Sequence, residues 1–108
     1  MGKATVRVAA GICGFDSEII AVSEDGQNVN VALTTQCPSL APMAEKLTEL
    51  DAFAACFGKL CDSQVYAIAN DYCAHSACPV PSGIIKAIEV ACGLALPKDV
   101  LMNITKDE

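Results

Sequence analysis

The stretch EIIAVSEDGQNVNVALT, residues 18–34, decides the fold of this 108-residue chain. It places two largely apolar runs, residues 19–22 and 29–33, on either side of the segment Glu24-Asp25-Gly26-Gln27-Asn28. Apolar and polar residues alternate in the second run, which is typical of a strand with one face toward water. Because Asp-Gly tolerates the positive φ of a tight hairpin turn, the stretch predicts two antiparallel strands.

The sequence before this hairpin predicts another strand, which completes a three-stranded meander. Residues 5–10 alternate between apolar and other positions, and the glycines of Gly11-Ile12-Cys13-Gly14 mark a turn into the next strand. In an antiparallel meander, the first connection and the end of the third strand lie at the same edge of the sheet. We therefore expect Cys13 and Cys37 at one rim, although they are far apart in sequence.

Helical spacing dominates the second half of the chain. Apolar residues recur at helical intervals through residues 40–54, after which Asp62 or Ser63 can cap a second helix. A third helix is expected from a cap at Ser82 to a terminator at Gly93. Residues 100–104 alternate again and predict a last strand.

These elements predict one α+β domain over residues 1–108. Its sheet is expected to be small and mostly antiparallel, a three-stranded meander plus a C-terminal strand, with about three helices packed on one face.

Composition narrows the classes of function. The chain is 53% hydrophobic, which argues against disorder and against a disulfide-stapled miniprotein. Its net charge of −6 argues against nucleic acid or an anionic membrane surface as a partner. The N-terminus lacks the apolar run of a signal peptide, so we expect a cytoplasmic protein. The apolar excess in so short a chain predicts a homo-oligomer, a dimer in the simplest case.

Seven cysteines need an explanation in a compartment that keeps thiols reduced. An odd number cannot pair completely within one chain. Cys92 lies on the apolar stripe of the third helix, and we expect it in the core. Cys56 and Cys61 are interpreted as packing or connecting residues.

The segment Cys73-Ala-His75-Ser-Ala-Cys78-Pro-Val-Pro81 gathers two thiols and the only histidine just before a helix. A helix N-terminus favours negative charge, which predicts a lowered pKa for Cys78. If the last strand runs parallel to the first, the third helix runs the opposite way, and Cys78 reaches the rim of Cys13 and Cys37. If the last strand is antiparallel, the segment lies at the opposite rim.

Three interpretations of these residues stay open, and whether the protein is an enzyme stays open with them. The first is a metal site of Cys13, Cys37 and Cys78, with His75 or Cys73 as the fourth ligand. Cys₃His and Cys₄ sets suit zinc, and Cys₄ also suits an iron–sulfur cluster.

The second interpretation is a reactive thiol at Cys78, the catalytic residue of a sulfur carrier or thiol-redox protein with a protein partner in sulfur or electron transfer. Cys73 could resolve it and His75 could assist it. The third is a non-catalytic interaction protein whose cysteines only pack.

Two resemblances add to these interpretations. On the segments GICGF (11–15), HSACPVP (75–81), GIIKAIEVA (83–91) and GLALPKDV (93–100), the chain resembles a family of small uncharacterised cysteine-rich proteins of anaerobic bacteria and archaea. An anaerobic setting would suit oxygen-sensitive thiols or clusters. Locally, Cys78-Pro79-Val80-Pro81 is similar to the Cys-Pro-x-Pro motif of the sulfur-carrier family, which implies a persulfide-bearing role for Cys78. In that family the motif follows the first strand, whereas here it lies late in the chain.

Overall fold

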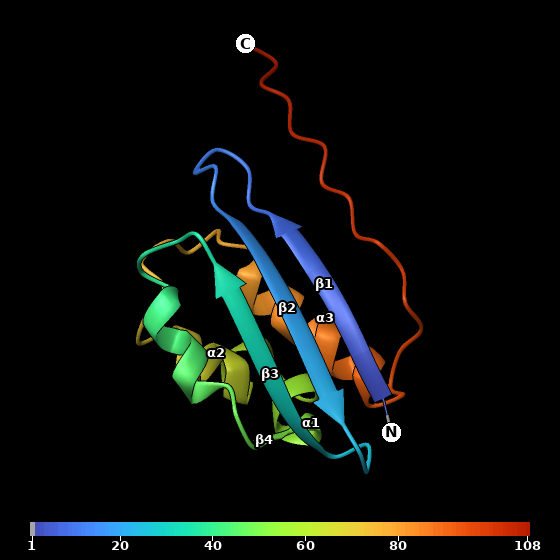
Figure 1. Cartoon of the computed structure of the whole chain (residues 1–108). Coiled ribbons are helices and arrows are strands. Elements are labelled where there is room, and N and C mark those ends of the chain that lie inside the picture. The colour runs from blue at the N-terminus through green and yellow to red at the C-terminus, as the bar shows by residue number, and fades with distance from the viewer. Residues whose placement is uncertain (1) are drawn as a thin grey trace.

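A computed structural model describes residues 2–108; Met1 of the expected domain lies outside the described residues. Four strands form one antiparallel sheet in the order β1-β2-β3-β4. They are β1 (Gly2–Ala9), β2 (Asp16–Ser23), β3 (Asn28–Thr35) and the short β4 (Leu50–Asp51). The helical segments are η1 (Ala41–Lys46), α1 (Ala52–Cys56), η2 (Leu60–Asp62), α2 (Gln64–Ala69) and α3 (Val80–Ala91), with η marking 3₁₀ helices. Figure 1 shows the helices on one face of the sheet, which confirms the predicted α+β class.

The β2–β3 hairpin is built around Asp25, as the sequence predicts. The Asp25 carboxylate accepts hydrogen bonds from the backbone N–H groups of Gln27 at 2.9 Å and Asn28 at 2.8 Å. The Asn28 side-chain amide donates to the other carboxylate oxygen at 2.8 Å. Gly26 has a φ of 78°, which a residue with a side chain rarely adopts. These bonds lower the pKa of Asp25 from 3.8 to about 2.

Replacing Asp25 with alanine is expected to lower the free energy of unfolding at neutral pH, and the loss is expected to shrink in acid. Because the folded-state pKa of about 2 lies below the ordinary value of 3.8, the carboxylate stabilises the fold above pH 3.8. That contribution is lost as the pH falls through about 2. Urea unfolding between pH 2 and 7 measures it, with Glu24→Ala in the same turn as the control. A difference between wild type and D25A that stays constant down to pH 2 would contradict this assignment.

The chain over residues 40–54 differs from the predicted continuous helix. Apolar residues at the expected spacing are buried, among them Leu40, Met43, Leu47 and Leu50. However, the helix is replaced by η1, β4 and α1. The reason is that β3 offers other hydrogen bonds: Val31 N–H donates to the Leu47 carbonyl at 2.9 Å, and Glu49 N–H donates to the Asn30 side chain at 2.7 Å. Glu49 consequently has a φ of 56° and turns the chain into β4.

Helix α3 lies directly on β1 and β2 and runs antiparallel to β1. A Cβ on Gly83 would lie 2.9 Å from Cγ2 of Val8 and 3.3 Å from Cδ1 of Ile19, so the helix approaches the sheet more closely than a larger residue would allow. At the other end of the helix, Gly2 lies against the Ala91 backbone. The inward face of α3 is completely buried in the core, with Ile84, Ala87 and Ile88 at 0% exposure.

The two ends of α3 form differently. The expected Ser82 cap is wrong: Pro79 is the N-cap residue without a side-chain cap, and the Ser82 hydroxyl instead donates back to the Pro79 carbonyl at 2.9 Å. Gly93 ends the helix as predicted, with a φ of 74°. Leu94 N–H donates to the Glu89 carbonyl at 2.7 Å and Gly93 N–H to the Val90 carbonyl at 3.2 Å, which is the pattern of a Schellman motif. The Ser63 cap on α2 is confirmed by its acceptance of the Val65 N–H.

The predicted C-terminal strand is wrong. Residues 94–108 adopt no regular structure, and Val100, Met102 and Ile104 are exposed. Their alternation is real, but a strand needs a partner for its backbone, and none lies beside them in the part of the chain described. The fourth strand is β4 instead. Among residues 2–108, no helix is both long enough and apolar enough to cross a membrane.

Candidate functional site

A pocket of about 170 Å³ lies at the end of the sheet where β1 leads into β2. It is lined by four of the seven cysteines and by the only histidine. These residues are Cys13, Cys37, Cys73, Cys78 and His75. Phe15, Leu40 and Val80 contribute apolar wall. Figure 1 shows the β1–β2 turn, the end of β3 and the start of α3 at this same end of the molecule. The pocket therefore brings together all five residues that the sequence singled out.

Cys13 belongs to the turn that joins β1 and β2. Gly14 N–H donates to the Gly11 carbonyl at 3.0 Å, which closes a four-residue turn with Cys13 in its third position. The side chain of Cys13 is exposed at the mouth of the pocket. This cysteine is held by a turn rather than by packing.

Cys37 follows β3 and is positioned by two hydroxyl groups. The buried Ser17 hydroxyl on β2 donates to Oγ1 of Thr35 at 2.7 Å, and the same Thr35 oxygen accepts the Cys37 N–H at 3.1 Å. The Cys37 carbonyl then accepts N–H groups from Leu40 and Ala41 at 3.2 and 3.1 Å. Sequence reasoning missed Ser17 and Thr35. The available signal was that Ser17 lies two residues before Ile19 and therefore on the same, helix-covered side of β2. A hydroxyl buried there needs a hydrogen-bond partner.

Cys73, His75 and Cys78 lie on the loop between α2 and α3. Cys73 N–H donates to the Ala69 carbonyl at 2.8 Å at the end of α2, and its thiol donates to the His75 carbonyl at 3.3 Å. Cys78 N–H donates to the same carbonyl at 3.0 Å. The His75 carbonyl thus ties the two cysteines into one compact turn, while the His75 residue itself is exposed.

Burial raises the pKa of the Cys78 thiol, which corrects the expectation of a lowered value. The expected helix effect is present, because the backbone N–H of Val80 at the start of α3 bonds the Cys78 sulfur and lowers the pKa. Burial outweighs it. The charge of a Cys73 thiolate, a hydrogen bond with Cys73, and the charge of a Cys37 thiolate each raise the pKa further. Cys73 and Cys37 are thus the two pocket cysteines that act on Cys78.

The three remaining cysteines lie outside the pocket. Cys92, at the C-terminal end of α3, and Cys56 on α1 are half-buried against the core, in keeping with their interpretation as packing residues. Burial raises the pKa of Cys56 to about 11, and its thiol faces the Ile85 carbonyl at 3.9 Å. Cys61 is exposed on η2. This set supplies controls for the pocket cysteines.

The pocket side chains line one cavity but are not arranged as a set of metal ligands. Within residues 2–108, no three cysteine, histidine, aspartate or glutamate side chains are gathered as a ready metal site. Cys73 and Cys37 both raise the pKa of Cys78, whereas Cys13 and His75 are exposed. Binding of a metal would therefore require the lining side chains to move closer together.

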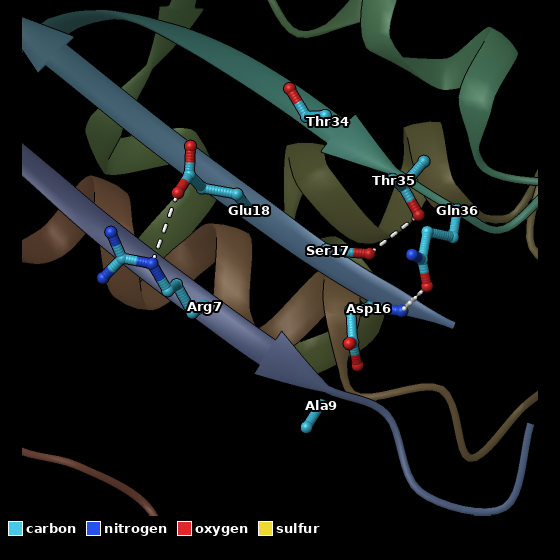
Figure 2. Close-up of a pocket in the computed structure, with 8 residues that line it drawn as sticks. All are labelled: Arg7, Ala9, Asp16, Ser17, Glu18, Thr34, Thr35 and Gln36. Atoms are coloured by element: carbon cyan, nitrogen blue, oxygen red, sulfur yellow. Dashed lines mark hydrogen bonds and ion pairs between the residues drawn. The ribbon is translucent and has the colours of Figure 1, made fainter. Parts of the chain in front are cut away.

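A second, larger hollow of about 470 Å³ lies on the opposite, helix-free face of the sheet. Figure 2 shows that its polar groups face one another: Arg7 pairs with Glu18 at 3.3 Å, and Asp16 N–H donates to the Gln36 side chain at 3.0 Å. Arg7 and Glu18 are direct partners in the β1–β2 register. This hollow is wide and its arginine is paired with Glu18, so the thiol-lined pocket is the stronger candidate for chemistry.

Comparison with curated proteins returns no match. A family match covers residues 4–104, which include most of β1, every later element, every pocket residue and most of the extended C-terminal segment. The chain therefore belongs to this family, a family of unknown function (DUF6951).

Proposed function

We propose that the protein binds a thiophilic metal centre, zinc or an iron–sulfur cluster, in the pocket at the rim of the sheet. The observation that carries the proposal is the convergence of four cysteines and the only histidine on one small pocket from three separate segments of the chain. Seven cysteines spread at random through a core would give no reason for this concentration.

The proposed ligand set has a fixed part and a mobile part. We assign Cys37, Cys73 and Cys78 to the fixed part, because all three line the pocket and both Cys73 and Cys37 act on the pKa of Cys78. Cys13 or His75 supplies the fourth ligand, which gives a Cys₄ or a Cys₃His set. Both sets suit tetrahedral zinc, and the Cys₄ set also suits an iron–sulfur cluster.

The chemistry of the pocket favours a soft metal over a hard one. Thiolate and imidazole ligands select zinc, copper(I) and iron–sulfur clusters, whereas calcium and magnesium require several oxygen ligands. Among the described lining residues no carboxylate faces the pocket. The apolar walls of Phe15, Leu40 and Val80 would limit access of water and oxidants to a bound centre.

Elemental analysis and visible absorption of protein purified under anaerobic conditions test the proposal. The expected result is either about one zinc per chain, or iron with acid-labile sulfide and a broad visible absorption that bleaches on reduction. Absence of all metals, together with no uptake of added zinc or of reconstituted iron and sulfide, would refute it.

A second candidate, sulfur transfer or thiol-redox chemistry at Cys78, is favoured by a different observation. The Cys73 thiol and the Cys78 N–H donate to the same His75 carbonyl, which holds the two residues together as a thiol and its resolving partner would be. In the sulfur-transfer version, the Cys78 thiolate attacks the outer sulfur of a donor persulfide. A Cys78 persulfide forms and the donor cysteine leaves as its thiolate. The raised pKa of Cys78 counts against this candidate, since little thiolate is present at rest.

Mass spectrometry separates the two candidates. After incubation with a cysteine desulfurase and cysteine, a sulfur carrier gains about 32 Da, the mass of one sulfur atom. Cys78→Ser should abolish that gain, and Cys92→Ser should keep it. Uptake of sulfur by the Cys78→Ser variant would rule out Cys78 as the acceptor. Either function requires reduced thiols, for which we propose the cytoplasm as the compartment.

A further inference from the structure

The C-terminal segment, residues 97–108, has no structural partner within its own copy of the chain. The last backbone hydrogen bonds before it are those of Leu94 and Ala95 to the Glu89 carbonyl. Figure 1 shows the segment leaving the body beside the N-terminus, standing clear of β1 and extending past the β1–β2 turn. All of its residues are exposed.

This segment nevertheless has the sequence of a strand. Val100, Met102 and Ile104 alternate with Leu101 and Asn103, and no proline follows Pro97, so every backbone N–H is available. Met102 is 74% exposed and Ile104 is 86% exposed, which is costly for side chains of this size. The family match extends through residue 104 and therefore includes this apolar alternation.

Strand β1 presents the complementary feature, an open edge. It pairs only with β2, so every other residue of β1 directs its N–H and C=O away from the sheet. Val6 and Val8 lie on the helix-covered side of β1 but remain half-buried, whereas Ile19 on β2 is completely buried. One more strand beside β1 would finish the burial of these two valines.

The two features match in spacing. Ala4, Val6 and Val8 point toward the helices at intervals of two residues, and Val100, Met102 and Ile104 recur at the same interval. A single register therefore places both apolar sets on the helix-covered side, with Leu101 and Asn103 on the opposite side. A shift by one residue would reverse all of these positions.

We propose that residues 97–108 of one copy pair with β1 of a second copy, and that the protein forms a homodimer by exchanging these C-terminal strands. The segment stands apart from its own β1. In a two-fold exchange, the C-terminal segment of each copy pairs with the open β1 edge of the other copy, so the same contact is made twice. Pairing by β-strand addition joins backbone groups that are otherwise unpaired on each side. This inference is independent of the proposed metal site.

Light scattering on a sizing column, in the presence of a reductant that excludes disulfide-linked dimers, gives the first test. The full chain is expected to have twice the monomer mass of 11.2 kDa. A chain ending at Leu96 is expected to be monomeric. Because the removed segment contacts little of its own copy, the shortened chain should keep its circular dichroism spectrum. A monomeric full chain, or a shortened chain that is still dimeric, would overturn the proposal.

Two neighbouring substitutions test the register. Met102→Lys places a charge against the helix-covered side and is expected to raise the dimer dissociation constant at least about 30-fold. Leu101→Lys removes a side chain of similar size but leaves the new charge on the open side, and should change the constant less than about 3-fold. Equal effects of the two substitutions would overturn the predicted register.

A labelled peptide of residues 95–108 identifies the receiving edge. It is expected to bind the chain that ends at Leu96 and to protect the backbone amides of β1 from hydrogen exchange. Protection on another surface would overturn the assignment to β1. A monomeric full chain with protected tail amides would show that the segment folds onto its own β1 and would overturn the exchange between copies.

Discussion

Cys78→Ser protein is expected to bind zinc about 100-fold more weakly than the wild type. Four-ligand structural zinc sites bind with roughly 10–16 kcal/mol, so the loss of one thiolate ligand removes about 3 kcal/mol, or two orders of magnitude. Cys78 is chosen because it lines the pocket and because both Cys73 and Cys37 act on its pKa. Competition with a chromophoric chelator, under anaerobic and reducing conditions, measures the affinity.

Helix α3 supplies a matched control for this substitution. Cys78 and Cys92 are both half-buried and lie just before and just after the same helix, but only Cys78 lines the pocket. Cys92→Ser should therefore leave the zinc affinity within about 2-fold of the wild type. A second pair, the exposed Cys13 and Cys61, tests the mobile ligand in the same way. Equal losses in the Cys78 and Cys92 variants would show that the effect is on folding and not on ligation.

Ile84→Ala is expected to lower the free energy of unfolding by about 2–5 kcal/mol. The side chain is completely buried on the inward face of α3, and its truncation removes apolar contacts and leaves a cavity that the tightly seated helix cannot easily close. Against a total stability of about 5–15 kcal/mol, this loss is large. Urea unfolding followed by circular dichroism measures it.

Ile12→Ala provides the contrast for this prediction. Ile12 is 100% exposed in the turn that carries Cys13, so its truncation should change the unfolding free energy by less than about 0.5 kcal/mol. If the two isoleucine variants lost similar stability, the seating of α3 on the sheet would be incorrect.

The meander could be predicted from sequence because its signals are local. Strand alternation and the Asp25-Gly26 turn both act within a few residues, and each indicates the same hairpin. The helix over residues 40–54 could not be excluded in this way. Its apolar spacing is real, but Asn30 and Val31 of β3 provide the hydrogen bonds that interrupt it, and these partners come from another element.

The positions of Cys13 and Cys37 at one rim followed from the meander, since antiparallel strands return to the same edge. Whether Cys78 reaches this rim depends on the direction of α3. The sequence argument tied that direction to the expected last strand, residues 100–104, which the structure does not form. In the structure, Gly2 at the start of β1 lies against Ala91 at the end of α3, and Gly83 near the start of α3 lies against Val8 near the end of β1. These contacts fix α3 antiparallel to β1. The closeness of Cys73 to Cys78 arises from the turn around the His75 carbonyl, for which no sequence pattern was available.

The close seating of Gly83 divides the pocket into a stationary wall and a movable one. Because a Cβ on Gly83, in the first turn of α3, would crowd Val8 and Ile19, the helix that follows Cys78 is held closely against the sheet. Cys13 has no such anchor, since a Cβ on either glycine of its turn would meet no atom within 4 Å. In the proposed metal site with Cys13 as the fourth ligand, the α3 side would therefore receive the ion first and the β1–β2 turn would close over it last. The rate of release would then be set by the opening of that turn, and stiffening it would slow exchange without changing which atoms bind.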